Sequence, residues 1–305
     1  MEDVTDTVFR QIIARHAPPD VFFTEFVNVD GMCSPGREAV IHRLRYTAIE
    51  RPIVAQVWGL KPENFEHAAR DIREMGFDGV DLNMGCSVKK VLKTGACARL
   101  IENPGLADEI IRAAREGADG MPVSVKTRIG YGAVKTEEWC GFLLGHNIAA
   151  LTVHGRTAKQ TYSIPADWRE IAKVVTLRDQ MRADTAIIGN GDIANVARNN
   201  AICDKYGVDG VMIGRGILHD PFAFGKPGTE NFSGLSAGEK AVLLREHLVL
   251  YKETWEEEKT VHVMKKFVRT YISNFKGATQ IRTQLMAADT YEDMLKSLSA
   301  ITERR

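Results

Sequence analysis

The sequence has no long hydrophobic run. No stretch approaches the roughly 18 consecutive apolar residues of a membrane-spanning helix. The opening residues, MEDVTDTVFR, lack the basic-then-apolar order of a secretion signal. We therefore expect a cytoplasmic protein without a membrane partner.

Cysteine is scarce, and neither sign of charge is in excess. The five cysteines are odd in number and form no CxxC pair, which argues against a disulfide framework and against a zinc site. With 40 basic and 40 acidic residues the formal net charge is zero, so a nucleic-acid-binding role would need a local basic patch. We expect no metal ion, and a monomer is favoured.

The chain does contain short apolar runs that alternate with helical patterns. The runs predict strands at 21–25, 53–57, 79–83, 123–127, 149–154, 186–189 and 210–214. Between them, apolar residues recur at helical spacing, as in Ala68, Ile72 and Met75. Continuous apolar strands alternating with helices predict a parallel sheet wrapped by helices.

Polar residues gather where these strands end. They are Glu25, Gln56, Asn83, Lys126, His154, Asn190 and Arg215. This distribution favours an eight-stranded (β/α)8 TIM barrel, whose site is built from the ends of many strands. The rival is a doubly wound open sheet, which would concentrate function at one switch point.

Seven strands are one fewer than such a barrel needs, and the sequence opens on a loop and a helix. We therefore expect the first strand to lie about 10 to 20 residues upstream of Met1. Residues 1–224 would form the barrel domain. Residues 225–235 are a glycine- and proline-punctuated linker, and 236–305 predict a small helical bundle that opens with a capping box at Ser236 and Glu239.

Two glycine-rich loops follow the last two predicted strands, at 189–192 and 214–216. Glycines let backbone N–H groups approach a phosphate, and these two loops form the recurrent phosphate site of α/β barrels. Lys126 and His154 end adjacent strands at the same mouth. The lysine could neutralise a reduced flavin, form a Schiff base or bind a phosphate.

Cys86 lies just beyond the strand at 79–83. An unperturbed thiol is mostly protonated at neutral pH, so Cys86 could be a proton donor as well as a nucleophile. Residues 259–282 are a separate feature, with six basic and no acidic side chains and with interleaved aromatics. That segment could follow a nucleic-acid backbone, or it could be a solvated helix face whose aromatics are core.

Together these segments resemble the flavin-dependent tRNA-dihydrouridine synthase family. The resemblance rests on MEDVTDTVFR, TEFV, AQVWG, DLNMGCSVKKVLKTGACARL, VKTRIG, LTVHGRT followed by Asp167-Trp168, GNGDI, DGVMIGRGILHDPF and KKFVRTYISNFKGA. It covers nearly the whole chain in order. It implies a flavin-binding barrel followed by a helical RNA-recognition domain.

The resemblance also implies roles for individual residues. Those implied to bind FMN are Met1, Gln56, Lys126, His154, Asn190, Gly191, Asp192, Gly214 and Arg215. Asn83 would position the uracil, and tRNA would bind through Lys265, Lys266, Arg269, Lys276 and Arg282. In the implied reaction NADPH reduces FMN, a hydride passes to carbon 6 of a uridine, and Cys86 protonates carbon 5.

One departure concerns the residue after the cysteine, which is usually proline in the family and is Ser87 here. This leaves the thiol-bearing loop less constrained. Three alternatives remain open. They are another FMN-dependent barrel reductase acting on a small pyrimidine or enone, a non-catalytic RNA-binding scaffold, and a Schiff-base aldolase using Lys126.

Overall fold

The computed structural model describes residues 3–193, 196–225, 231–255 and 258–302. The chain divides into two compact units, and each is described by itself. The first consists of Met1–Thr7, Asp20–Ile193 and Ala197–Gly214. The second contains Val8–Pro19 and the chain from Arg215 onward. The predicted domain boundaries stay a prediction, and part of the predicted linker, 226–230, lies outside the described residues.

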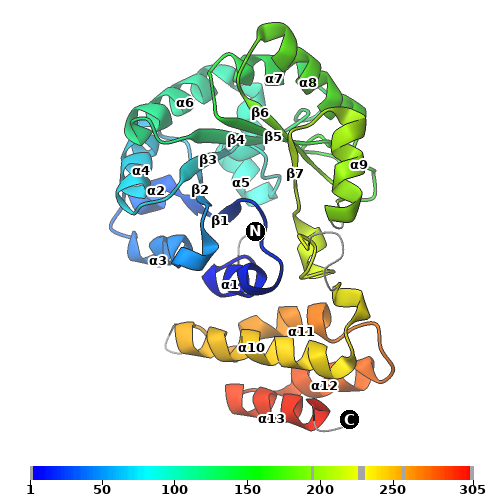
Figure 1. The fold of residues 1–305 in the computed structure, drawn as a ribbon. Coiled ribbons are helices and arrows are strands. Elements are labelled where there is room, and N and C mark those ends of the chain that lie inside the picture. The colour runs from blue at the N-terminus through cyan, green and yellow to red at the C-terminus, as the bar shows by residue number, and fades with distance from the viewer. Residues whose placement is uncertain (1–2, 194–195, 226–230, 256–257, 303–305) are drawn as a thin grey trace. The chain divides into compact units, whose positions relative to one another are not determined.

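The first unit is built on one parallel sheet, whose strands lie side by side in Figure 1 in the order of the sequence. The strands are β1 (Phe22–Asn28), β2 (Ile53–Trp58), β3 (Gly79–Asn83), β4 (Val123–Arg128), β5 (Ala150–His154), β6 (Ala186–Asn190) and β7 (Gly210–Met212). The predicted strands are confirmed. A doubly wound sheet reverses its order at a switch point, which this sheet does not do. Closure into an eight-stranded barrel stays a prediction.

Helices connect the strands and surround the sheet (Figure 1). They are α2 (Val29–Met32), α3 (Glu38–Ile41), α4 (Pro62–Glu74), α5 (Lys89–Thr94), α6 (Pro104–Ala118), α7 (Thr136–Leu144), α8 (Trp168–Met181) and α9 (Val196–Tyr206). In α4, Pro62 starts the helix and Ala68 and Ile72 are buried, as their spacing predicts. Met75 instead lies just past the helix end and is 36% exposed, because the chain turns at Gly76 with a φ of 79°.

The second unit is helical in its described residues. Its helices are α1 (Thr7–His16, of which all but the first residue belong here), α10 (Ala237–Trp255), α11 (Lys265–Tyr271), α12 (Ala278–Ala287) and α13 (Tyr291–Thr302). The capping box before α10 is confirmed, since the Ser236 and Glu239 side chains each accept the other's backbone N–H. Phe9 of α1 stacks on Phe267 of α11, which builds a core from both ends of the chain.

Shorter 3-10 segments complete the structure. They span His42–Leu44, Ala48–Glu50, Cys97–Glu102, Arg215–Leu218, Phe232–Gly234 and Val261–Met264. Among the described helices none is long and apolar enough to cross a membrane. The described residues also contain no cluster of three or more His, Cys, Asp or Glu side chains that could hold a metal ion.

Candidate active site

The register of the sheet sets the predicted site residues beside one another at the ends of the strands. Facing positions on neighbouring strands are Gln56 with Asp81, Asn83 with Lys126, Arg128 with His154, and His154 with Asn190. Because the strands are parallel, their carboxyl ends share one edge of the sheet. Five of the predicted polar residues, Gln56, Asn83, Lys126, His154 and Asn190, thus lie near that edge, whereas Glu25 lies in the middle of β1 and Arg215 belongs to the second unit. Their roles stay a prediction.

A buried hydrogen-bond chain joins β3, β2 and the segment that follows β3. The Gln56 side chain donates to Asp81 at 2.7 Å, and Asn83 donates to the Gln56 carbonyl at 3.0 Å. The Asn83 carbonyl oxygen then accepts the backbone N–H groups of Gly85, at 3.1 Å, and Cys86, at 3.0 Å. The orientation of both amides is therefore fixed, since each end has a partner of one kind only.

This chain of hydrogen bonds leaves one side-chain N–H donor on each of its two amides available to a ligand. Each side-chain amide has two N–H donors and one carbonyl oxygen. Gln56 and Asn83 each use one N–H within the chain, so each keeps a second donor. Both residues can therefore bind a further acceptor without losing the contacts that orient them.

Asp81 is the acceptor at which this chain of hydrogen bonds ends, and it was not predicted as a site residue. Burial raises its pKa to about 6, while hydrogen bonds from Ser124 and Gln56 act in the opposite direction. A carboxylate inside an apolar strand is seldom buried without a specific partner. The acidic residue within the apolar run Gly79-Val-Asp-Leu could thus have marked Asp81 as a site residue. Its partners Gln56 and Ser124 lie on other strands, so the sequence did not reveal them.

Lys126 provides a cation at the same edge. Burial lowers its pKa to about 8, and the nearby Arg128 contributes in the same direction, whereas Asp81 and Cys86 oppose the shift. Within the described part of the chain its ammonium group makes no hydrogen bond or ion pair. An ammonium group that makes no direct hydrogen bond or ion pair is suited to bind an electron-rich or anionic ligand.

Cys86 is half-buried, and Cys97, the other thiol of the same segment, is fully buried. A hydrogen bond between the two thiols, together with burial, raises the pKa of Cys97. Cys97 is therefore protonated and inert at neutral pH. Of the two, Cys86 is the thiol that a ligand can reach.

His154 belongs to a second buried group on the other side of the edge. Its Nε2 accepts from Arg156 at 3.1 Å, which requires a proton on Nδ1 if the imidazole is neutral. Arg156 also grips both carboxylate oxygens of Asp192, at 2.7 and 2.6 Å. The Asp192 carboxylate is thus occupied, and a phosphate could meet only its backbone N–H.

Arg156 was missed because the sequence does not reveal that pair. Its side chain is only 1% exposed, and it also donates to the Ile164 carbonyl at 2.6 Å. The LTVHGRT segment contains it, yet its partner Asp192 lies on the following loop. Arg156 therefore fixes His154 and the glycine-rich loop as one unit.

Glycine is required at Gly191 of that loop. A Cβ atom there would lie 2.6 Å from Ala166 Cβ and 3.0 Å from His154 Cδ2, and the φ of 126° suits only glycine. At Gly214 nothing lies within 4 Å of such an atom. Arg215 belongs to the second unit, and Met1 lies outside the described residues.

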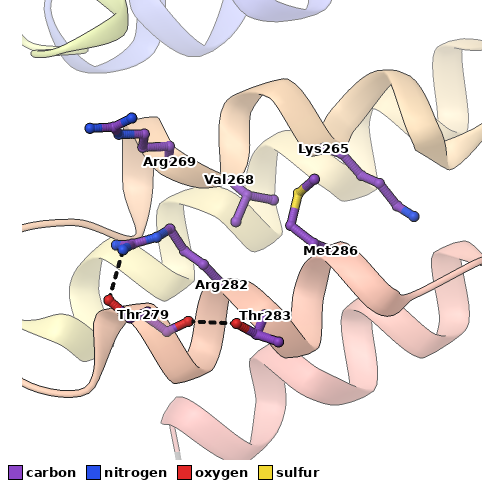
Figure 2. Close-up of a pocket in the computed structure, with 7 residues that line it drawn as sticks. All are labelled: Lys265, Val268, Arg269, Thr279, Arg282, Thr283 and Met286. Carbon is purple, nitrogen blue, oxygen red and sulfur yellow. Dashed lines mark hydrogen bonds between the residues drawn. The ribbon is translucent and has the colours of Figure 1, made fainter.

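The predicted basic residues lie in the second unit, where Figure 2 shows a pocket of about 450 Å³ between α11 and α12. It is lined by Lys265, Val268, Arg269, Thr279, Arg282, Thr283 and Met286. The Arg282 guanidinium is anchored on the Ile272 carbonyl and on Thr279, both at 2.9 Å. The Lys265 ammonium lies 3.8 Å from the Asp289 carboxylate, and Arg269 is exposed.

The remaining features of the basic segment are divided between surface and core. Lys266 and Lys276 are exposed, whereas Phe267 and Tyr271 are buried. The two aromatics therefore belong to the core of the second unit and offer no stacking surface. This agrees with the alternative that the interleaved aromatics are core residues.

Comparison with known proteins gives matches over nearly the whole chain. The family model of dihydrouridine synthase (Dus) matches residues 1–304. A probable tRNA-dihydrouridine synthase 2 of Bacillus subtilis (strain 168) is 42% identical over 297 residues, which cover 96% of this chain and 90% of that protein. A probable tRNA-dihydrouridine synthase of Staphylococcus aureus (strain COL) is 43% identical over 289 residues, covering 94% and 86%.

Solved structures give more remote matches. Morphinone reductase in complex with tetrahydroNAD is 15% identical with a TM-score of 0.48, and the match covers 73% of this chain and 81% of that one. At this identity and TM-score the likeness says nothing about function.

Proposed function

The chain belongs to the dihydrouridine synthase family, and we propose that it reduces the 5,6 double bond of uridines in cytoplasmic tRNA. The observation on which this rests is the half-buried Cys86 thiol, held at the carboxyl edge of the sheet beside the Lys126 cation. A thiol in that position can donate a proton. The relatives named as tRNA-dihydrouridine synthases support the same reaction.

The residues at the edge of the sheet fit FMN as the cofactor. Gln56 has a spare N–H donor, Lys126 is a cation without a hydrogen-bond partner among the described residues, and His154 is rigidly held. A Cβ on Gly191 would meet Ala166 and His154, so only glycine fits at this position of the loop. The backbone N–H groups of this glycine-rich loop would bind the phosphate, with Gly214 and Arg215.

When bound, reduced FMN supplies the hydride for carbon 6 of the uracil ring, with NADPH as the source of electrons. The chain's own groups do the remaining work. Asn83 orients the uracil through its free N–H, and Cys86 donates its proton to carbon 5. Lys126 balances negative charge at the edge of the cofactor.

The target base must leave its stack to reach this edge, so a second surface has to hold the RNA backbone. We assign that surface to the basic residues that line the pocket of Figure 2, Lys265, Arg269 and Arg282, together with the exposed Lys266 and Lys276 of the same segment. Basic side chains on one face can follow phosphates without reading sequence. The acid beside Lys265 is Asp289, and the basic side chains named above outnumber it.

The spectrum of the purified protein tests the proposal. We expect flavin absorbance that bleaches on anaerobic addition of NADPH and returns when tRNA lacking dihydrouridine is added, with dihydrouridine appearing in the RNA. A colourless protein that still binds tRNA would instead support the RNA-binding scaffold. Reoxidation by a free pyrimidine or enone but not by tRNA would favour the small-molecule reductase.

A further inference from the structure

The segment that bears Cys86 is held from two sides. On one side Asn83 accepts the backbone N–H groups of Gly85 and Cys86. On the other side lies Arg128, the last residue of β4, whose side chain is buried beneath the segment. The backbone around Cys86 is thus held by the Asn83 amide on one side and by the Arg128 guanidinium on the other.

Arg128 uses three separate donors to grip three places. Its Nε donates to the Gly85 carbonyl at 2.6 Å, and one terminal nitrogen donates to the Ser87 hydroxyl at 3.2 Å. The other terminal nitrogen donates to the Thr157 carbonyl, also at 3.2 Å. Gly85 and Ser87 are the immediate neighbours of Cys86, so the two contacts bracket the thiol.

The base of this clamp is rigid. The Thr127 hydroxyl donates to the Met84 carbonyl at 3.2 Å, and the Trp139 indole donates to the same hydroxyl at 2.8 Å. The Met84 N–H donates to the Lys126 carbonyl at 2.8 Å. The end of β4 therefore serves as a fixed platform from which Arg128 reaches the segment.

Holding a guanidinium here is costly for the fold. Burial lowers the pKa of Arg128, and a hydrogen bond with Tyr162 partly offsets that shift. The Gly85 and Thr157 carbonyls and the Ser87 hydroxyl, which accept its other hydrogen bonds, carry no formal charge. A buried cation without a close counter-ion is unfavourable unless every donor is well used. The geometry is accordingly suited to fixing the positions of the acceptors.

We propose that Arg128 is the positioning residue for Cys86, and that it directs the thiol by holding Gly85 and Ser87 together. This inference rests on the proposed function, in which Cys86 is the proton donor. A lysine could not replace the arginine, because one compact ammonium group cannot span three acceptors in fixed directions. Loss of the clamp would leave the thiol present but misplaced.

The test compares Arg128→Lys, Ser87→Ala and the double variant with the parent protein. The matched control is Arg112→Lys, at a guanidinium on α6 that is 76% exposed. Two rates are measured separately under anaerobic conditions: flavin reduction by NADPH, which needs no thiol, and reoxidation by tRNA, which does. The rate of Cys86 alkylation by iodoacetamide, followed by peptide mass spectrometry, reports on the thiol without turnover.

We expect Arg128→Lys to slow reoxidation by tRNA by about 100-fold, as a displacement of about 1 Å can. Flavin reduction should stay within about twofold, because hydride transfer from NADPH makes no demand on the thiol. Cys86 alkylation should become several times faster, since the positive charge is retained while the segment loosens. Ser87→Ala should slow reoxidation by about fivefold, the effect of one hydrogen bond, and add little to Arg128→Lys.

Equal losses in both half-reactions would show that Arg128 is merely structural and would overturn the proposal. So would a reoxidation rate within about twofold of the parent in Arg128→Lys. If that variant fails to fold, Ser87→Ala decides alone, and unchanged reoxidation and alkylation in it count against the clamp. Cys86→Ala distinguishes failure of this inference from failure of the proposed function, because normal reoxidation by tRNA in that variant would refute the proposed function itself.

Discussion

Cys86 and Cys97 are two thiols of one segment that differ in exposure. We expect Cys86→Ala to lower dihydrouridine formation by about 10²- to 10⁴-fold, the usual contribution of a general acid. Flavin content should be unchanged, since no predicted cofactor contact is removed. Mass spectrometry of nucleosides from treated tRNA measures the product.

Cys97→Ala is the matched control for that prediction. Cys97 has a φ of 55°, and alanine keeps the Cβ, so the backbone is no more strained in the variant than in the parent. We expect its activity to stay within a few-fold. The assignment of Cys86 would be wrong if the two variants lost activity equally.

Lys126 should make cofactor binding depend on pH. Its pKa of about 8 means that the ammonium cation is present below that pH and is lost above it. Raising the pH from 7 to 9 should therefore weaken FMN binding, by up to about tenfold because about one tenth of the lysine remains protonated at pH 9. Quenching of flavin fluorescence gives the dissociation constant.

The titration is best made in the Cys86→Ala protein as well, because Cys86 is one of the groups that influence the pKa of Lys126. Lys126→Arg keeps its charge at pH 9 and should bind FMN equally at both values. Lys126→Met should bind weakly at both. A pH dependence that persists in Lys126→Met would assign it to another group.

At the residue scale, the sequence allowed site residues to be proposed one by one where a strand end marked them. Cys86 lies three residues after β3 and Lys126 lies near the end of β4, so their position along the sequence was enough to propose them. Asp81, Arg128 and Arg156 were missed because their roles depend on partners from other strands. Register and side-chain direction, which set those pairs, are not contained in a local pattern.

At the scale of elements, the glycine-rich loop after β6 depends on close packing. Gly191→Ala should lower the free energy of unfolding by about 2 kcal/mol or more, since the new methyl group meets Ala166 and the φ of 126° is strained. Cofactor affinity should fall as well, because the loop must move. Urea denaturation measures the first effect and fluorescence titration the second.

Gly141→Ala, inside α7, is the control for a bare change of glycine to alanine. Nothing lies within 4 Å of the added atom, and helix propensity should stabilise the protein by about 0.5 to 1 kcal/mol. Similar destabilisation of the two variants would mean that packing at Gly191 is not special.

Strands and caps were the most predictable elements. The apolar runs mark the buried strands, and β3 spans Gly79–Asn83 as its run predicts. The capping box at Ser236 with Glu239 is local, so a short pattern determines it. Met75 was placed on the apolar face wrongly, because the end of α4 depends on the turn at Gly76.

At the scale of the whole molecule, the grouping of distant segments was not predictable. Phe9, near one end of the chain, stacks on Phe267, and His16 stacks on Phe222. Periodicity shows that α1 has an apolar face but does not show which helices cover it. The second unit therefore recruits a helix that the sequence placed with the sheet.

The charge of the second unit should govern tRNA binding. Arg269 and Lys276 are exposed, so Arg269→Gln with Lys276→Gln should weaken binding without unfolding the unit, unlike changes at Arg282, which is anchored on Ile272. Two lost phosphate contacts should reduce the slope of log K against log salt by about 1.5. Flavin reduction by NADPH should be unaffected, and Arg112→Gln on α6 is the control. An unchanged slope would place the RNA-binding surface elsewhere.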